Sequence, residues 1–227
     1  MTQSTKDQTE KLARLSSDCS YLLTHLIRKN NKDILTDNDA SKILQLILNI
    51  NNHSKNPMLI GGNIGWYGAC GSAKLYQPYT NDHFLAPTET KGVCFTDSTL
   101  AGLRAHRKVF QTKHGLAFDR EFLYQQGANP CLNIRDSLLR QEIDKAPPGK
   151  YNHVYNFIPQ EIAGFVNIIH ESFDSTHERE WRILGNFDFI YSDIKFIFCP
   201  EDEFEIFSAI QTKGLPALFD LMWLDRV

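Results

Sequence analysis

The sequence lacks most of the patterns that identify metalloproteins, secreted proteins and membrane proteins. Its five cysteines are scattered, odd in number and without a CxxC pair, which disfavours a zinc site and a disulfide framework. No apolar run approaches the length of a membrane span, and the polar N-terminal residues include no segment of signal-peptide type. These absences favour a soluble, cytoplasmic protein with reduced thiols and no membrane partner.

Strong charge and repetition are also missing. A net charge of −3 over 227 residues argues against a protein that coats nucleic acid by bulk charge, although a local basic patch remains compatible with it. There are no internal repeats or low-complexity tracts, and the length favours one domain with additional peripheral segments. We expect a polar lead-in over residues 1–18 and a single α+β domain over residues 19–227. If that domain has two lobes, the KAPPGK segment at 145–150 divides them.

The apolar periodicity predicts strands and helices that do not alternate in a strict βαβ order, and this favours an α+β fold. Residues 19–29 fit a first strand or a buried helix turn. The later strands are expected at 92–96, 115–118, 130–134, 179–184 and 194–199. Helices are expected at 37–50, 98–111, 119–127, after residue 134 through Ile143, and at 159–170, 202–211 and 215–224. Asp37 or Asp39 would cap the first helix, Ser98 would cap the second, and Gly127 would stop the third.

The glycine-rich segment LIGGNIGWYGACGSAKLY, residues 59–76, resembles neither of the common phosphate loops. Its glycines do not follow the GxGxxG spacing, and Lys74 comes too soon after Gly71 for a GxxxxGK[ST] loop. One interpretation is a loop whose backbone approaches a ligand closely. The other is a loop with unusual backbone angles, packed over Trp66 and Tyr67.

Two further positions are candidates for ligand contact. If residues 19–29 form a strand, His25 faces away from Leu26, where it could bond a ribose hydroxyl or a phosphate, or be a half-buried core histidine. Arg104, Arg107 and Lys108 have the i, i+3 and i+4 spacing of one helical face. That face could meet phosphates of a nucleic acid or a cofactor, or it could simply be solvated.

The segment STHEREWRILG, residues 175–185, concentrates charge at the start of an apolar strand. In an extended chain Glu178, Glu180 and Arg182 would share one side, with Arg179, Trp181 and Ile183 on the other. With an arginine beside two carboxylates, one carboxylate could stay ionised while the pKa of the other is raised. Glycosidic chemistry uses an ionised glutamate in this way. A salt-bridged strand edge explains the same pattern.

Several of these segments, in this order, resemble the AbiGi family of abortive phage-infection proteins. The matching stretches are YLLTHLIRK, ASKILQLIL, GVCFTD, HGLAFDREFLYQQGANPCLNI and EREWRI, spread over residues 20 to 200. The resemblance implies a role in phage defence, and the family is described as antitoxins.

A more distant resemblance, to the DarT-like ADP-ribosyltransferases, concerns mechanism. It rests on an early apolar segment with a histidine, a helix, a glycine-containing loop and a late strand entered by a glutamate. It implies an ADP-ribosyltransferase-like fold, with Glu180 catalytic, Glu178 assisting it and His25 holding NAD. Thr96 or Tyr67 would fill the middle-strand position of that superfamily. Arg28, or the cluster of Arg104, Arg107 and Lys108, would hold the pyrophosphate or the substrate.

The sequence therefore supports two hypotheses of different kinds. The first is an NAD-dependent ADP-ribosyltransferase effector of a phage-defence or toxin–antitoxin system, with NAD as substrate and no metal. Its acceptor would be a nucleic acid, RNA or DNA, and a cognate antitoxin or chaperone would be its protein partner. The second is a non-catalytic antitoxin or sensor that binds a protein through its polar N-terminal helix and the C-terminal residues Leu218, Leu221, Met222 and Trp223. For a metal nuclease the sequence offers no convincing ligand cluster of the D-x-D or H-x-x-E type. An NAD glycohydrolase would use the site of the first hypothesis with water as acceptor.

Overall fold

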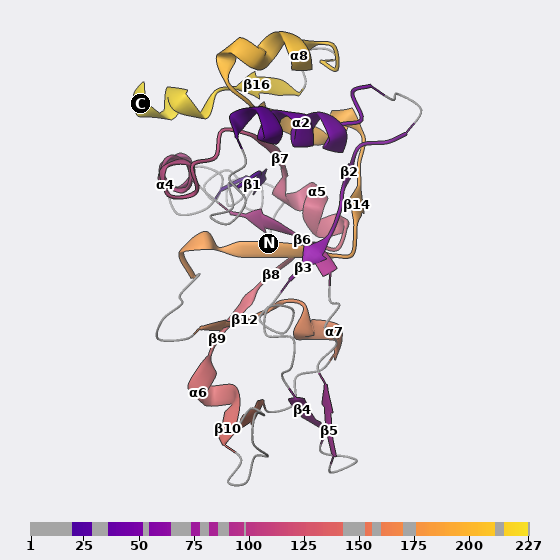
Figure 1. The fold of residues 1–227 in the computed structure, drawn as a ribbon, viewed down its shortest axis with the longest axis vertical. Coiled ribbons are helices and arrows are strands. Elements are labelled where there is room, and N and C mark those ends of the chain that lie inside the picture. Colours follow the sequence, from indigo (N-terminus) through magenta and orange to yellow (C-terminus); the bar gives the residue numbers. More distant parts are fainter. Residues whose placement is uncertain are drawn as a thin grey trace, which may run out of the picture. The chain divides into compact units, whose positions relative to one another are not determined.

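The computed structural model describes residues 20–28, 36–51, 55–64, 74–77, 82–85, 91–97, 99–142, 153–155, 160–169, 176–211 and 216–226. These residues combine helices with antiparallel and parallel strand pairs, which confirms the expected mixture of α and β structure with a mixed sheet (Figure 1). The contacts divide the chain into two compact units. The first takes in Met1–Leu59, Phe95–Gln126 and Asp188–Val227, and the second Ile60–Cys94 and Gly127–Phe187. The expected division near 145–150 falls outside the described residues.

The first unit is built on a mixed sheet with the strand order β16-β15-β7-β1-β6. Neighbouring strands are antiparallel except β15 and β16, which are parallel. Its strands are β1 (Leu22–Leu26), β2 (Met58–Leu59), the end of β6 (Lys91–Thr96), β7 (Gly115–Asp119), β15 (Ile194–Phe198) and β16 (Ala217–Phe219). Its helices are α2 (Asp37–Ile47), α4 (Leu100–Phe110), α5 (Arg120–Gln125), η2 (Tyr191–Asp193), η3 (Glu201–Glu203), α8 (Phe204–Ser208) and η4 (Leu221–Arg226).

Strand β7 is the centre of this unit. It pairs with β1 along its whole length and with β15 on its other side, and Leu116, Ala117 and Phe118 are fully buried. The run GLAF is therefore apolar on both faces, unlike the alternating pattern of a half-buried strand. The ring of Phe118 makes edge contacts with Phe95 and Phe189, with centroids 6.0 and 5.0 Å apart. Burial of each such side chain stabilises the fold by about 1.5–3 kcal/mol.

The helix signals in the sequence identify α2, α4 and α5 but shift their ends. Helix α2 begins at Asp37, and its N-cap is Thr36, which forms a capping box with Asp39. Helix α4 begins at Leu100 and is capped by the Thr99 hydroxyl, which accepts from Gly102 N; the expected cap, Ser98, lies outside the described residues. Gly127, at φ 91°, follows α5 in the left-handed conformation, which confirms it as the stop.

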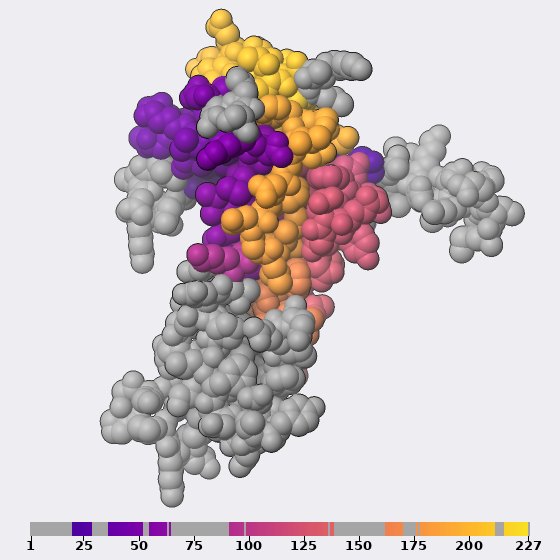
Figure 2. All heavy atoms as spheres, turned by 90° about the vertical axis from the view of Figure 1, so that its right-hand side faces the viewer, coloured from indigo at the N-terminus to yellow at the C-terminus, as the bar shows by residue number. Residues whose placement is uncertain are grey.

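The C-terminal part of the first unit differs from the expected pair of helices. Residues 202–211 contain only the end of η3 and the short helix α8, and residues 215–224 contain β16 followed by η4. The helix prediction for residues 215–224 is wrong, because β16 pairs in parallel with β15 and holds the chain extended. In segment η4, Leu221 and Leu224 pack into a core with Leu103 of α4. Figure 2 shows the C-terminal residues, in yellow, next to the indigo residues of α2.

The second unit contains several small sets of strands. The first part of β6 pairs with β3 and lies beside β13, which pairs with β8 on its other side. Strands β9 and β12 form a parallel pair, and the order β10-β11-β4-β5 forms a third set. The strands are β3 (Gly62–Asn63), β4 (Lys74–Gln77), β5 (Asp82–Leu85), β8 (Asn129–Pro130), β9 (Leu132–Arg135), β10 (Arg140–Glu142), β11 (His153–Tyr155), β12 (Val166–Ile169) and β13 (Glu180–Leu184). Strand β14 (Phe187–Asp188) follows, and the helices are α6 (Asp136–Leu139), α7 (Gln160–Ala163) and η1 (Thr176–Glu178).

Two expected helices of the second unit are mostly wrong. Among the described residues 160–169, only Gln160–Ala163 is helical, and Val166–Ile169 form β12. This segment is extended because it pairs with β9 over four residues, from Val166 opposite Leu132 to Ile169 opposite Arg135. The helix expected to run through Ile143 ends at Leu139 and is followed by β10. Tertiary strand pairing overrides local propensity at both places.

No helix within the described ranges combines the length and apolar content that a membrane crossing requires.

Candidate functional site

The chain turns sharply just before strand β13. Glu178 is the last residue of the 3₁₀ helix η1, and Arg179 adopts a positive φ of 45°. Strand β13 starts at Glu180, one residue later than expected. The proposed alternation therefore holds only from Glu180 onward, and the prediction that Glu178 shares a strand face with Glu180 is wrong. Arg179 breaks the extended conformation that this arrangement requires.

Glu180 and Arg182 form a bidentate ion pair on one face of β13. The Nε of Arg182 donates to Oε1 of Glu180 and its Nη2 donates to Oε2, both at 2.9 Å. The side chains are 11% and 4% exposed. Strand β13 lies between the first part of β6 and β8, and both side chains are mostly buried, so the pair is not the solvated strand edge that the sequence also allowed.

Strand β12 supplies the remaining partner of the pair. The amide of Asn167 donates from Nδ2 to Oε2 of Glu180 at 2.9 Å, and its Oδ1 accepts from Nη2 of Arg182. The Nη1 of Arg182 donates to the backbone carbonyl of Gly164 at 2.8 Å. All three nitrogens of the guanidinium have acceptors, so the buried charge is compensated and the carboxylate is held in one orientation.

These contacts fix the protonation state of Glu180. Burial raises the pKa of its carboxyl group, but hydrogen bonds and charge from Arg182 lower it, together with hydrogen bonds from Cys94 and Asn167. The net pKa lies below the ordinary value, so the group is a carboxylate at neutral pH. The pKa of Arg182 is raised, because its contacts with Glu180 outweigh the effect of burial.

Two cysteines belong to the surroundings of this ion pair. Burial raises the pKa of Cys94 to about 12, and the charge of Glu180 acts in the same direction. Burial likewise raises the pKa of Cys131 to about 12, and the backbone N–H of Cys131 donates to the Glu180 carbonyl at 2.8 Å. Neither cysteine forms a disulfide within the described residues. A thiol with such a pKa stays protonated at neutral pH and is a poor nucleophile.

His25 and Thr96 lie in the first unit. His25 is the fourth residue of β1 and is partly exposed, while Leu26 is buried, so the expected opposition of these two side chains is confirmed. The His25 ring makes an edge contact with Phe95, with centroids 6.0 Å apart. Thr96 is 4% exposed, and its carbonyl accepts from the hydroxyl of Thr24 at 3.2 Å. Its hydroxyl therefore has little contact with solvent.

The basic candidates of the first unit all contact other side chains. The guanidinium of Arg28 lies 4.1 Å above the ring of Phe110, a cation–π contact with α4. Arg104, Arg107 and Lys108 share one face of α4, as expected, and all three reach the carboxylate of Asp225. Tyr67, the other candidate for NAD contact, lies outside the described residues.

The structure thus brings together Glu180 and Arg182 in one unit, and Arg104, Arg107 and Lys108 in the other. Glu178 lies in the separate 3₁₀ helix η1, and His25, Arg28 and Thr96 belong to the first unit. The sequence analysis missed Asn167 as a partner of Glu180, because it placed this residue in a helix. A polar amide between Val166 and Ile168, within an apolar run, was the one signal that could have identified it.

Comparison with known proteins assigns no family to this chain. No protein-family model matches the chain, and no match was found among curated proteins or solved structures.

Proposed function

We propose that this chain is an NAD-dependent ADP-ribosyltransferase that acts in the cytoplasm as a phage-defence or toxin–antitoxin effector, with an ADP-ribosyltransferase-like fold and a nucleic-acid acceptor. The observation that carries the proposal is the state of Glu180: an ionised carboxylate, mostly buried and held in one orientation by Arg182 and Asn167. The resemblance of EREWRI, and of the segments before it, to AbiGi and DarT-like proteins supplies the reaction and the biological role.

The reaction needs a fixed negative charge. The bond between the nicotinamide nitrogen and the ribose C1′ breaks with both electrons going to nicotinamide, and positive charge develops on C1′ and the ring oxygen. A carboxylate held in place stabilises that charge without first reorganising, which is the largest contribution such a group makes. The acceptor then attacks C1′ with a lone pair and releases its proton. Arg182 keeps Glu180 ionised for this purpose.

Contact with the ribose requires room at the carboxylate. Glu180 accepts from Arg182, Asn167 and the Cys94 thiol. A thiol is a weak donor, so a ribose hydroxyl that replaces it can donate to the carboxylate without breaking the ion pair. The side chain of Glu180 is 11% exposed, so it is not completely sealed from solvent.

The experiment that tests the proposal uses the pure full-length chain and NAD labelled in its adenylate part. The protein is incubated with RNA, with DNA and with cell lysate, and labelled acceptors are separated from free NAD. Label in RNA or DNA is the expected result. Label only in protein would overturn the nucleic-acid acceptor. If free ADP-ribose is the only product of NAD, the protein is a glycohydrolase and not a transferase.

A second function is favoured by one specific observation. Both oxygens of Glu180 already accept hydrogen bonds from the chain itself, as expected for a purely structural ion pair. In that case the protein is a non-catalytic antitoxin or sensor that binds a protein partner. Of the residues expected to dock, Met222 is 45% exposed, whereas Leu221 is fully buried in the core. Expression with and without its neighbouring gene separates the two functions, because an effector harms the cell alone and an antitoxin protects it.

A further inference from the structure

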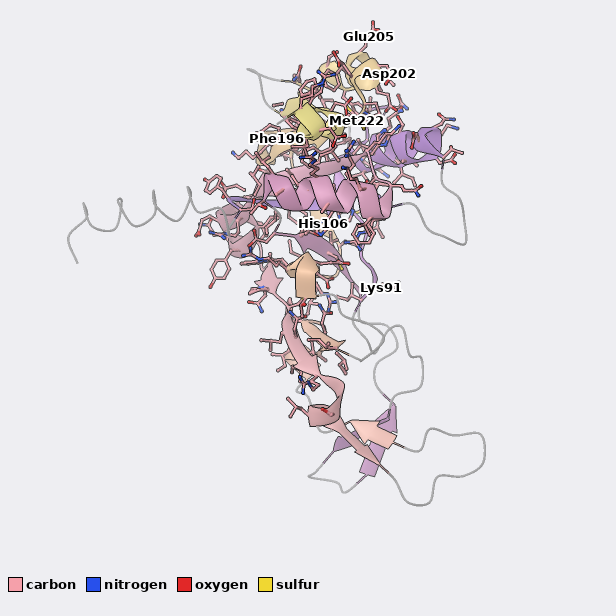
Figure 3. The ribbon with its side chains drawn as sticks, turned by 90° about the vertical axis from the view of Figure 1, so that its left-hand side faces the viewer. Lys91, His106, Phe196, Asp202, Glu205 and Met222 are labelled. Atoms are coloured by element: carbon pink, nitrogen blue, oxygen red, sulfur yellow. The ribbon has the colours of Figure 1, made fainter. Side chains whose placement is uncertain are left out.

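Three cationic side chains of helix α4 converge on a single carboxylate from segment η4. Nη2 of Arg107 lies 2.5 Å from Oδ2 of Asp225, and Nε of Arg104 lies 3.2 Å from Oδ1. Nζ of Lys108 is 3.8 Å from the same Oδ1. Three positive charges therefore face one negative charge, an excess of two. Figure 3 shows the helix that carries these cations, with His106 labelled on it, and Met222 on the neighbouring C-terminal segment.

Arg107 is incompletely satisfied by this arrangement. Its side chain is 7% exposed, and its Nε is buried with no hydrogen-bond acceptor within the described part of the chain. Its Nη1 contacts the sulfur of Met222, which is a weak acceptor. A buried guanidinium normally has acceptors for all its nitrogens, because an uncompensated charge is costly to desolvate. Arg107 thus has capacity for a further anionic oxygen.

The apolar anchor of η4 on α4 does not include Asp225. The residues that anchor η4 are Leu221 and Leu224, which are fully or almost fully buried next to Leu103. Asp225 follows them and is 36% exposed. A rotation of its side chain alone would free all three cations, while the apolar contacts keep η4 on α4. The pKa of Asp225 is lowered, first by its hydrogen bond from Arg107, so the competing group carries a full charge at neutral pH.

We propose that Arg104, Arg107 and Lys108 form a binding site for the phosphate groups of a nucleic acid, and that Asp225 occupies this site as an internal competitor. Arg107 and Lys108 each lie one helical turn, roughly 5–6 Å, from Arg104, so the three cations form a compact cluster that can contact neighbouring phosphates of one strand. Arg104 and Lys108 are 43% and 60% exposed, and their charged groups reach solvent. The guanidinium of Arg107 supplies the directional donors that phosphate oxygens favour.

This site would bind the class of acceptor named in the proposed function, a nucleic acid, and the inference rests on that function to this extent. Its test nevertheless needs no NAD and no catalysis. Binding without transfer would refute only the enzyme, and transfer without binding at this face would refute only the site.

The decisive comparison is between Asp225→Asn and Asp202→Asn in the full-length chain. Both variants remove one negative charge, and Asp202 lies on the exposed turn η3 of the same unit (Figure 3). A fluorescent single-stranded RNA is titrated by anisotropy at several salt concentrations. We expect D225N to bind roughly fivefold more tightly than the unaltered chain, the factor that corresponds to one exposed charge pair. The log–log salt slope should steepen by about 0.7 for each additional phosphate contact on a single strand. D202N should leave both quantities unchanged.

A second variant keeps the proposal testable if D225N does not fold. The double change Arg104→Gln and Lys108→Gln affects only exposed side chains and should lower RNA affinity and flatten the salt slope. Equal affinities for D225N and D202N would overturn the proposal, as would an unchanged affinity of the double variant. Tighter binding of D225N to a polyglutamate peptide but not to RNA or DNA would also overturn it. The proposal would likewise be overturned if pyrophosphate saturated the site and RNA bound no more tightly than pyrophosphate.

Discussion

Arg182 binds Glu180 through two parallel hydrogen bonds of 2.9 Å, from Nε to Oε1 and from Nη2 to Oε2, although only one residue separates them in the chain. The strand geometry makes this possible, because residues two apart in β13 face the same side. Asn167 bridges the two groups from β12. The result is a carboxylate that is ionised and immobile, and every expectation about this unit follows from that state.

Replacement of Arg182 by Met should destabilise the protein severely. The variant leaves Glu180 buried without its counter-charge, and breaking a buried pair in this way costs about 3–5 kcal/mol. Urea unfolding followed by circular dichroism measures the loss. The matched control is Lys91→Met, which removes an exposed cation from β6 in the same unit, and should change the free energy of unfolding by no more than about 0.5 kcal/mol. Equal stabilities for the two variants would refute the buried ion pair.

The ion pair should also make stability depend on pH in a defined direction. The folded pKa of Glu180 is lowered, so its contribution is present above the unfolded value of about 4.3 and is lost as pH falls through the folded value. The difference in melting temperature between the unaltered chain and Glu180→Gln should therefore be largest near neutral pH and shrink below about pH 4. A thermal melt series from pH 3 to 7 checks this, and a constant difference would contradict it.

The two cysteines beside Glu180 should react slowly in the folded protein. Their pKa values of about 12 keep Cys94 and Cys131 protonated at neutral pH, and only the thiolate is alkylated. Iodoacetamide treatment followed by peptide mass spectrometry reports each cysteine separately. Alkylation in denaturant is the control and should be complete within minutes. Rapid modification of either thiol in the native state would show that its surroundings stabilise the anion instead.

Strand β1, which carries His25, depends on a close approach of backbone at Gly115. A Cβ atom at this position would lie 2.4 Å from the carbonyl oxygen of His25, which cannot move without breaking the β1–β7 pairing. Gly115→Ala should therefore lower the free energy of unfolding by at least about 1–3 kcal/mol. Gly62→Ala is the matched control, because a Cβ there meets nothing within 4 Å. Similar melting temperatures for the two variants would contradict the close packing.

Strands and helices with strong local signals were predictable from the sequence. Strands β6, β7, β13 and β15 lie within one or two residues of their expected bounds, since each is a short apolar run flanked by turn residues. Helices α2 and α4 have clear apolar stripes. Their caps were displaced to Thr36 and Thr99, because several polar residues compete for the position and only the backbone geometry selects one.

Long-range pairing was not predictable in the same way. Val166–Ile169 and Ala217–Phe219 are extended because β9 and β15 supply parallel partners, and their apolar residues fit a helix equally well. The same limit applies to the site. Alternation placed Arg182 next to Glu180 correctly, but the positive φ of Arg179 removed Glu178 from that face. Asn167 was invisible as a partner because β12 itself was missed, and Asp225 was separated from α4 by more than a hundred residues.

The most direct test of the account measures nicotinamide release from NAD by the unaltered chain, by Glu180→Gln and by Glu205→Gln, each checked for folding by circular dichroism. Glu205 lies on the surface of α8 and serves as the matched control for loss of one carboxylate (Figure 3). The account predicts release by the unaltered chain and by E205Q, and a rate at least about 100-fold lower for E180Q, the size of effect expected when a positioned catalytic group is removed. Full activity of folded E180Q, or no release by the folded unaltered chain, would contradict a catalytic Glu180.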